Sequence, residues 1–336
     1  MIDVLFRADD GPGIGAGHLM RCRALAEAVE AAGGRAHLLA HADSPLHRDW
    51  RAEGARVETH GLLIGSGQDM DATLKFARAV EADWLVADGY AFDVAWLEAL
   101  ARQHRLLYLD DLGARDAAAA LVLNQNAGAE ERYRTTYTRA RRALLGVEWF
   151  LLGCAWQAVT PRPEPGRLLV TLGGDDRDNL TLALMRVLLA DGRAFHADVV
   201  CSAPEAGFQA AWELASACPD RFTLHRVPID LAPLMARASV AVCGGGVTPL
   251  EAASLGVPLV IKVLADNQAP GAQALASAGA ALVVAGESEG VTGVAGLALG
   301  LLADDDARAV LAERAHALVD GKGAARVMAV MTEAMQ

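Results

Sequence analysis

The sequence predicts an α/β protein of two doubly wound, parallel-sheet domains, with the interdomain cleft as the expected ligand site. The chain has 336 residues, more than one ordinary core holds, since domains cluster at about 100–150 residues. Short apolar runs alternate with helical patterns in both halves, which is typical of strand–helix–strand units. The stretch PRPEPG at 161–166 interrupts this alternation, and its prolines favour a stiff linker.

Twelve apolar runs are the expected strands. They span residues 2–7, 36–40, 55–60, 83–88, 105–110 and 120–125 in the first half, and 167–172, 197–202, 222–227, 239–244, 258–263 and 280–285 in the second. Over 19–29, apolar residues recur every three or four positions, which predicts a helix that Gly33 and Gly34 terminate. We therefore expect one domain over 1–158 and a second over 165–336, whose last helix is free to pack back on the first.

Composition and charge argue against several classes of function. The chain is 53% apolar and 21% charged, and its net charge of −12 lacks the basic surplus that nucleic acid or an anionic membrane surface requires. Its five cysteines are scattered without a C-x-x-C pair, so we expect buried thiols in a reducing cytoplasm, with no disulfide and no metal site. The longest weakly apolar stretch, 290–303, is shorter than the roughly 20 residues of a membrane span, so we expect no membrane insertion. No motif calls for a bound cofactor, and the oligomeric state stays open.

The segment GPGIGAGHLMR at 11–21 joins the first expected strand to the first expected helix. It fits the dinucleotide fingerprint G-x-G-x-x-G poorly, because alanine or histidine takes the third glycine position. Its glycines, Gly15 and Gly17 among them, allow a ligand to approach the helix start. His18 falls in the first helical turn, where the positive helix end favours a neutral imidazole that can accept a proton. A general base and a histidine that only caps the turn are equally open on this ground.

Further polar side chains follow other expected strands. Asp88-Gly89-Tyr90 and Asp110-Asp111 lie at strand ends that share the sheet edge of the opening loop if the sheet is parallel. In TLGGDD, the pair Gly173-Gly174 ends a strand, and the acids after it suit either a ligand loop or a helix cap.

The block SVAVCGGGVTPLEAASLGVPLVIKVLADNQ at 239–268 is the strongest candidate for a ligand site. Its three glycines lead into a helix at Thr248, and bare amides in such a turn suit a diphosphate. Glu251 lies one turn later, where it can accept hydrogen bonds from ribose hydroxyls or act as a capping-box partner. The next strand ends in Asp266-Asn267-Gln268, which offers polar groups at the same sheet edge.

Six motifs occur in order along residues 1–280: FRAD at 6–9, IGAGHLMR at 14–21, DGY at 88–90, DDL at 110–112, GGDD at 173–176 and ADNQ at 265–268. Together they resemble the UDP-2,4-diacetamido-2,4,6-trideoxy-β-L-altropyranose hydrolase family of pseudaminic acid biosynthesis. The block at 239–268 is also similar to the nucleotide-binding half of the UDP-GlcNAc transferase that completes lipid II. These resemblances imply a GT-B fold, two Rossmann-like domains with UDP held mainly by the second. The chain departs from the pattern at Gly89, Asp175, Val247 and Leu250, which affects the sugar identity more than the UDP site.

The resemblance also implies residue roles and a reaction. His18 is the implied base for water, in a metal-independent hydrolysis that inverts the anomeric carbon and yields free sugar and UDP. The implied substrate-binding residues are Arg7, Asp9, Gly15, Gly17, Arg21 and Tyr90 in the first domain, and Gly173, Gly174, Gly244, Gly245, Gly246, Val247, Thr248, Glu251, Asp266, Asn267 and Gln268 in the second. The alternative is a UDP-sugar-dependent glycosyltransferase on the same fold, for which no apolar, basic patch in the first domain marks a membrane-bound acceptor. A UDP-sugar 2-epimerase and a non-catalytic nucleotide-sugar binding protein are less favoured.

Overall fold

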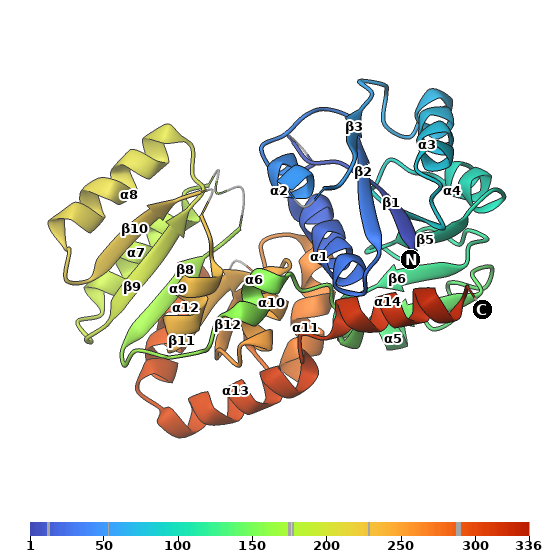
Figure 1. The fold of residues 1–336 in the computed structure, drawn as a ribbon. Helices are drawn as coiled ribbons and strands as arrows, with labels where there is room; N and C mark the ends of the chain where they lie inside the picture. The colour runs from blue at the N-terminus through green and yellow to red at the C-terminus, as the bar shows by residue number, and fades with distance from the viewer. Residues whose placement is uncertain are drawn as a thin grey trace. The chain divides into compact units, whose positions relative to one another are not determined.

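The computed structural model describes residues 1–11, 14–52, 54–173, 176, 178–227, 229–286 and 290–335. The chain divides into two compact units, Met1–Cys154 with Gly321–Gln336, and Ala155–Asp320 (Figure 1). Each unit is built on a parallel sheet with helices packed on it, so the predicted class of two doubly wound α/β domains is confirmed.

The first unit has a seven-stranded sheet in the order β3-β2-β1-β4-β5-β6-β7, and its strand pairs are parallel. The strands are β1 (Asp3–Ala8), β2 (Arg35–Ala40), β3 (Val57–Thr59), β4 (Trp84–Asp88), β5 (Arg105–Leu109), β6 (Leu121–Asn124) and β7 (Arg142–Leu145). The strand order reverses between β1 and β4. In doubly wound sheets, ligands bind outside the carboxyl ends of the strands at such a switch point.

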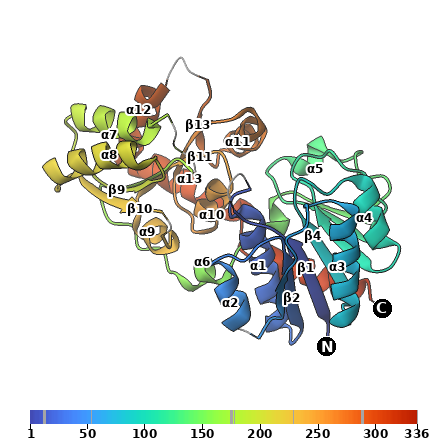
Figure 2. The same ribbon diagram turned by 90° about the horizontal axis from the view of Figure 1, so that it is seen from above.

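Helices of the first unit cover both faces of this sheet, as Figure 2 shows for its two sides. They are α1 (Gly17–Ala31), α2 (His47–Ala52), α3 (Gly67–Ala79), α4 (Val94–Ala101), α5 (Ala129–Arg132), the 3-10 turn η1 (Val147–Trp149) and α14 (Gly323–Glu333). One core packs α1, α2 and α14 on the sheet, and a second core packs α3 and α4 on the other face. The last helix thus belongs to the first unit, with Val327 and Met331 fully buried.

The second unit has a six-stranded parallel sheet in the order β10-β9-β8-β11-β12-β13, which reverses between β8 and β11. Its strands are β8 (Arg167–Thr171), β9 (His196–Cys201), β10 (Phe222–Arg226), β11 (Val240–Gly244), β12 (Leu259–Lys262) and β13 (Leu282–Val284). Its helices are α6 (Cys154–Ala158, at the unit boundary), α7 (Leu180–Ala190), α8 (Glu205–Ala217), α9 (Ala232–Arg237), α10 (Thr248–Ser254), η2 (Asp266–Gln268), α11 (Ala269–Ser277), α12 (Gly290–Leu302) and α13 (Asp305–Leu318).

The structure departs from the sequence-based expectations in three places. It adds strand β7, which no apolar run marks, because two of its four residues are exposed on the edge of the sheet. The proline stretch is not an unattached linker, because the amides of Arg162 and Glu164 donate to carbonyls at the end of α9. Cys154 is exposed, so the expectation that every cysteine is buried is wrong.

Candidate functional site

His18 lies at the switch point of the first unit, in the first turn of α1. The Nδ1 atom of His18 is 2.7 Å from Oδ1 of Asp88, the last residue of β4. One helical turn later, Arg21 donates to both carboxylate oxygens of Asp88, at 2.5 and 2.6 Å. All three residues are at most 7% exposed, so they form a buried charged cluster.

The charge of Asp88 determines which nitrogen of His18 carries the proton. Burial alone raises the pKa of this carboxyl, but the Arg21 guanidinium and His18 outweigh it and lower the pKa to about 2. Asp88 is therefore ionised near neutral pH and only accepts hydrogen bonds, so the Nδ1 of His18 is the donor. In the neutral imidazole, Nε2 is then left as the proton acceptor, which is the form that a general base needs.

Arg21 also connects this cluster to the end of the neighbouring strand β5. Its Nη1 donates to both oxygens of Asp111, at 2.7 and 2.8 Å. Tyr90 donates its hydroxyl to Asp111 at 3.3 Å, and its ring lies edge-on to His18 with centroids 4.7 Å apart. Tyr90 remains 58% exposed, so its ring forms an accessible wall beside the buried imidazole.

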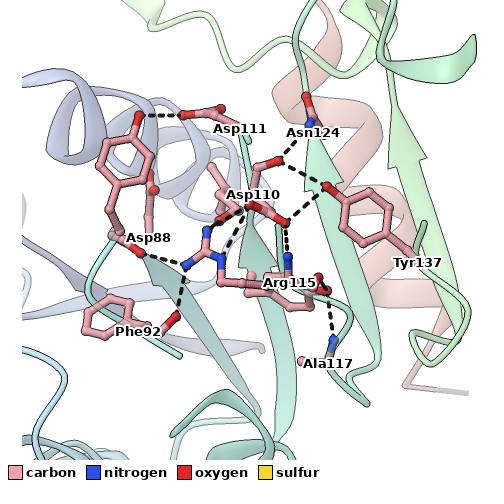
Figure 3. A network of polar contacts seen from close by, with 12 residues as sticks. Asp88, Phe92, Asp110, Asp111, Arg115, Ala117, Asn124 and Tyr137 are labelled. Carbon is pink, nitrogen blue, oxygen red and sulfur yellow. Dashed lines mark hydrogen bonds and ion pairs between the residues drawn. The ribbon is translucent and has the colours of Figure 1, made fainter. Parts of the chain in front are cut away.

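A second buried network holds the two loops that carry these side chains (Figure 3). Arg115 donates to the carbonyls of Gly89 and Phe92 after β4, and also to the carboxylate of Asp110 after β5. Tyr137 donates to Asp110 as well. These contacts fix the loops after β4 and β5. They therefore hold Tyr90 and Asp111 in position beside His18.

The charged residues of the FRAD motif belong to a buried network of the first unit. Arg7 is fully buried, its Nε donating to Asp69 at 2.9 Å and its Nη1 to Asp9 at 2.7 Å. Asp9 also accepts the amide of His41 at 2.6 Å. Both side chains thus brace the loop between β1 and α1, and a direct contact of either with substrate stays an untested prediction.

The opening loop is a compact turn in the residues that the structure describes. Gly11 and Gly15 form an antiparallel bridge, and Gly15 has φ of +80°, a conformation that favours glycine. Gly17 begins α1, and a Cβ added there would meet open space. Open space therefore lies beside the helix start at Gly17, and ligand binding there stays a prediction. Gly13 of the weak dinucleotide fingerprint lies outside the described residues.

In the second unit, the turn after β8 combines a glycine with a helix cap. Gly173 has φ of +116°, and its carbonyl accepts the hydroxyl of Ser202. The N-cap residue of α7 is Asn179, but Asp176 accepts the amides of Leu180 and Thr181 and so satisfies the first turn of the helix as a cap would. Gly174 lies outside the described residues, so its expected ligand role is not addressed.

The triple-glycine turn after β11 is packed closely on its neighbours. A Cβ added at Gly244 would lie 2.7 Å from the Leu172 carbonyl, and one at Gly245 would lie 2.8 Å from the Gln268 side chain. The amide of Gly245 donates to Gln268, which therefore ties the turn to the end of β12. A Cβ at Gly246 would meet open space. Sequence reasoning did not predict this structural role of Gln268. The one signal for it was the position of Gln268 at the end of the adjacent strand.

Glu251 is not a capping-box partner. The N-cap of α10 is Val247, which has no side-chain acceptor, so that interpretation is wrong. Burial raises the pKa of Glu251 to about 7, and a hydrogen bond with Thr248 opposes the rise. The side chain is therefore mixed between its acid and carboxylate forms near neutral pH. Asp266 and Asn267 are exposed beside this turn, in η2.

The structure thus gathers the expected residues into local groups. In the first unit, His18, Arg21 and Tyr90 share one cluster, while Arg7 and Asp9 belong to the bracing network. In the second unit, the residues from Gly244 to Glu251 and from Asp266 to Gln268 lie at the carboxyl ends of adjacent strands. Within the described residues, no group of three metal-ligating side chains forms a metal site. Across the same part of the chain, no helix is long and apolar enough to span a bilayer.

Comparison with known proteins identifies the fold. No family model matches the chain. The chain superposes on MurG of Acinetobacter baumannii with a TM-score of 0.71 at 16% identity, over 99% of this chain and 100% of that one. A glycosyltransferase from Rickettsia africae gives 0.69 at 9% identity over 100% and 99%. The chain has a GT-B fold. HepE from Anabaena, solved with UDP and glucose, gives 0.64 at 15% identity over 99% and 100%.

One curated relative also matches. An uncharacterized protein of Methanocaldococcus jannaschii is 22% identical over 222 residues, which are 61% of this chain. The matched region spans 45% of that relative, less than half its length. These identities are low, so the likeness establishes the fold and leaves the activity to be argued from the site.

Proposed function

We propose that this protein transfers a sugar from a UDP-sugar to an acceptor hydroxyl, with His18 as the general base. The observation that carries the proposal is the short contact between His18 and an ionised Asp88, which leaves Nε2 as the proton acceptor. The similar structures support transfer over hydrolysis, since they include a named glycosyltransferase.

In the proposed reaction, the acceptor oxygen attacks the anomeric carbon while the carbon–oxygen bond to UDP breaks. The acceptor proton moves to Nε2 of His18, and Asp88 stabilises the imidazolium that forms. Displacement from the face opposite UDP inverts the anomeric centre. UDP leaves as the diphosphate, so charge develops on its phosphate oxygens.

The second unit supplies the proposed UDP site. Because Gly245 already donates its amide to Gln268, the amides that remain for the diphosphate are those of Gly246 and Val247. Glu251, with a pKa of about 7, can both accept and donate hydrogen bonds and so suits a pair of ribose hydroxyls. Asn267 is an exposed polar residue beside this turn, and we assign it to the sugar.

Hydrolysis of a UDP-linked 6-deoxy diacetamido sugar is the second candidate. It is favoured by the ordered motifs around His18 and the strand ends, which resemble those of the hydrolase family. Water would then replace the acceptor hydroxyl, and His18, paired with Asp88, would take its proton.

Incubation of the purified protein with a panel of UDP-amino sugars separates the candidates. UDP release only after an acceptor extract is added supports transfer. Release in buffer alone, with ¹⁸O from labelled water on the sugar, supports hydrolysis. His18→Gln is expected to lose at least about 100-fold in turnover under either mechanism while UDP binding persists. A fully active His18→Gln protein would exclude both.

A further inference from the structure

A cavity of about 700 Å³ opens at the amino ends of the strands of the first unit. Its lining comes from the residues just before β4, β5, β6 and β7, including Asp83, His104, Arg105, Ala120 and Arg141. His18 and Asp88 lie at the carboxyl ends of the same sheet. A five-residue strand is roughly 16 Å long, so the cavity is separate from the candidate active site.

The charge of this cavity is unusual for an acidic chain. Four arginines line it, Arg102, Arg105, Arg139 and Arg141, against two carboxylates, Asp83 and Glu98. Both carboxylates are already engaged: Asp83 accepts the amide of Asp3, and Glu98 pairs with Arg139. Among the described residues, the other three guanidinium groups that line the cavity have no carboxylate as an ion-pair partner.

The three remaining arginines are not explained equally well by the fold. Arg102 is the C-cap of α4, where a cation is favourable beside the helix dipole. Arg105 donates its Nε to the Ala334 carbonyl at 3.3 Å, and its two terminal nitrogens remain available to bind a ligand. Arg141 donates its backbone amide to Ala119, but its side chain has no partner in the described part of the chain. Arg105 and Arg141 also line a smaller adjoining depression beside Ala334, whose one carboxylate, Glu333, is paired with Arg142.

We infer that this cavity binds a phosphate-bearing small molecule through Arg105 and Arg141, with Arg102 as a third cation. Planar guanidinium groups bind phosphate oxygens in pairs, and several of them suit a diphosphate better than a single carboxylate. The cavity volume is in the range of small-ligand sites. Ala82, Ala101, Ala118, Ala119 and Ala120 provide a small-residue floor for the organic part of the ligand. This inference does not depend on the proposed sugar transfer.

The test uses inorganic pyrophosphate as the probe and the full chain throughout. Arg105→Gln with Arg141→Gln removes two exposed cations from the cavity. Arg48→Gln with Arg134→Gln removes two exposed arginines that line no part of it, so both variants carry the same net charge. Calorimetric titration at low salt should show at least a tenfold weaker pyrophosphate affinity in the first variant and less than a twofold change in the control. Because both variants leave the second unit intact, pyrophosphate bound there does not affect the comparison.

Vesicle sedimentation distinguishes a free phosphate from a lipid headgroup. If vesicles of phosphatidylglycerol and phosphatidylcholine pellet the wild type but not the Arg105/Arg141 variant, the phosphate is carried by lipid. If pyrophosphate binds and the vesicles do not, the ligand is free in solution. Equal weakening in both double variants, no weakening in either, or no pyrophosphate binding by the wild type would overturn the inference.

Discussion

Replacement of Asp88 by Asn tests the part of the site on which the mechanism depends. The lowering of the Asp88 pKa from 3.8 to about 2 corresponds to about 2 kcal/mol of stabilisation of the folded state. Loss of this carboxylate also leaves the buried Arg21 with Asp111 alone, and breaking a buried pair costs about 3–5 kcal/mol when no partner remains. We expect Asp88→Asn to lower the free energy of unfolding by about 2–4 kcal/mol.

The pH dependence of this loss has a definite direction. A carboxyl whose folded pKa is depressed stabilises the fold fully above its unfolded pKa, and this contribution disappears as pH falls through the folded value. The stability difference between wild type and Asp88→Asn should therefore be constant above about pH 4 and shrink toward pH 2. Urea unfolding followed by tryptophan fluorescence measures it, since Trp50, Trp84 and Trp96 are buried in the first unit.

Turnover gives the decisive readout, because it reports on the imidazole and not on the fold. A neutral amide no longer requires Nδ1 of His18 to be the donor, so Nε2 is no longer held as the acceptor. We expect UDP release to fall by about 100-fold or more in Asp88→Asn. Asp111→Asn is the matched control, since Asp111 binds Arg21 and Tyr90 without touching His18. Turnover of Asp88→Asn within threefold of wild type from pH 6 to 9 would refute the orienting role.

Three further substitutions have expected outcomes. Glu251→Gln should stabilise the protein at pH 8 by about 1–3 kcal/mol, because the raised pKa of Glu251 makes its ionisation costly in the folded state. This gain in stability should vanish below about pH 4.5, and urea unfolding at both pH values measures it. Gly245→Ala should cost about 1–3 kcal/mol because its Cβ has no room, whereas Gly246→Ala should change stability by less than about 0.5 kcal/mol; equal denaturation midpoints would contradict this packing argument. Arg7→Met should destabilise the first unit by about 2–4 kcal/mol, because the buried carboxylate of Asp69 then keeps only the Gly65 amide and the His60 imidazole as partners. An unchanged unfolding midpoint would mean that Arg7 is not a bracing residue.

The sequence predicted the features that depend on local pattern. Apolar runs located the strands around both switch points, and polar residues at their ends marked Asp88, Asp111 and the turn before Thr248. Without the family resemblance, the residues alone leave His18 open between a general base and a turn cap, because its contact with Asp88 joins residues 70 positions apart. Strand β7 has no apolar run to reveal it, because this edge strand begins with the exposed residues Arg142 and Ala143.

Features built from distant pairs could not be read from one sequence. The ion pair of Arg7 is one such feature, since nothing near Arg7 in the chain shows that Asp69, 62 positions away, binds its guanidinium. No basic patch stood out in the first domain, because the cavity arginines come from two short segments, 102–105 and 139–141. Parallel sheets place the starts of successive strands side by side, so only the fold brings these segments together.

The position of α14 has a consequence for how the chain is made. A nascent chain presents the first sheet and α1 early, but the helix that completes their shared core follows the whole of the second unit. Until then, the apolar surface that later buries Val327 and Met331 stays uncovered. Because α1 carries His18 and Arg21, the support of the His18–Asp88 pair is complete only when α14 has packed on α1. A translating ribosome therefore completes the core of the first unit only after it has made the second unit.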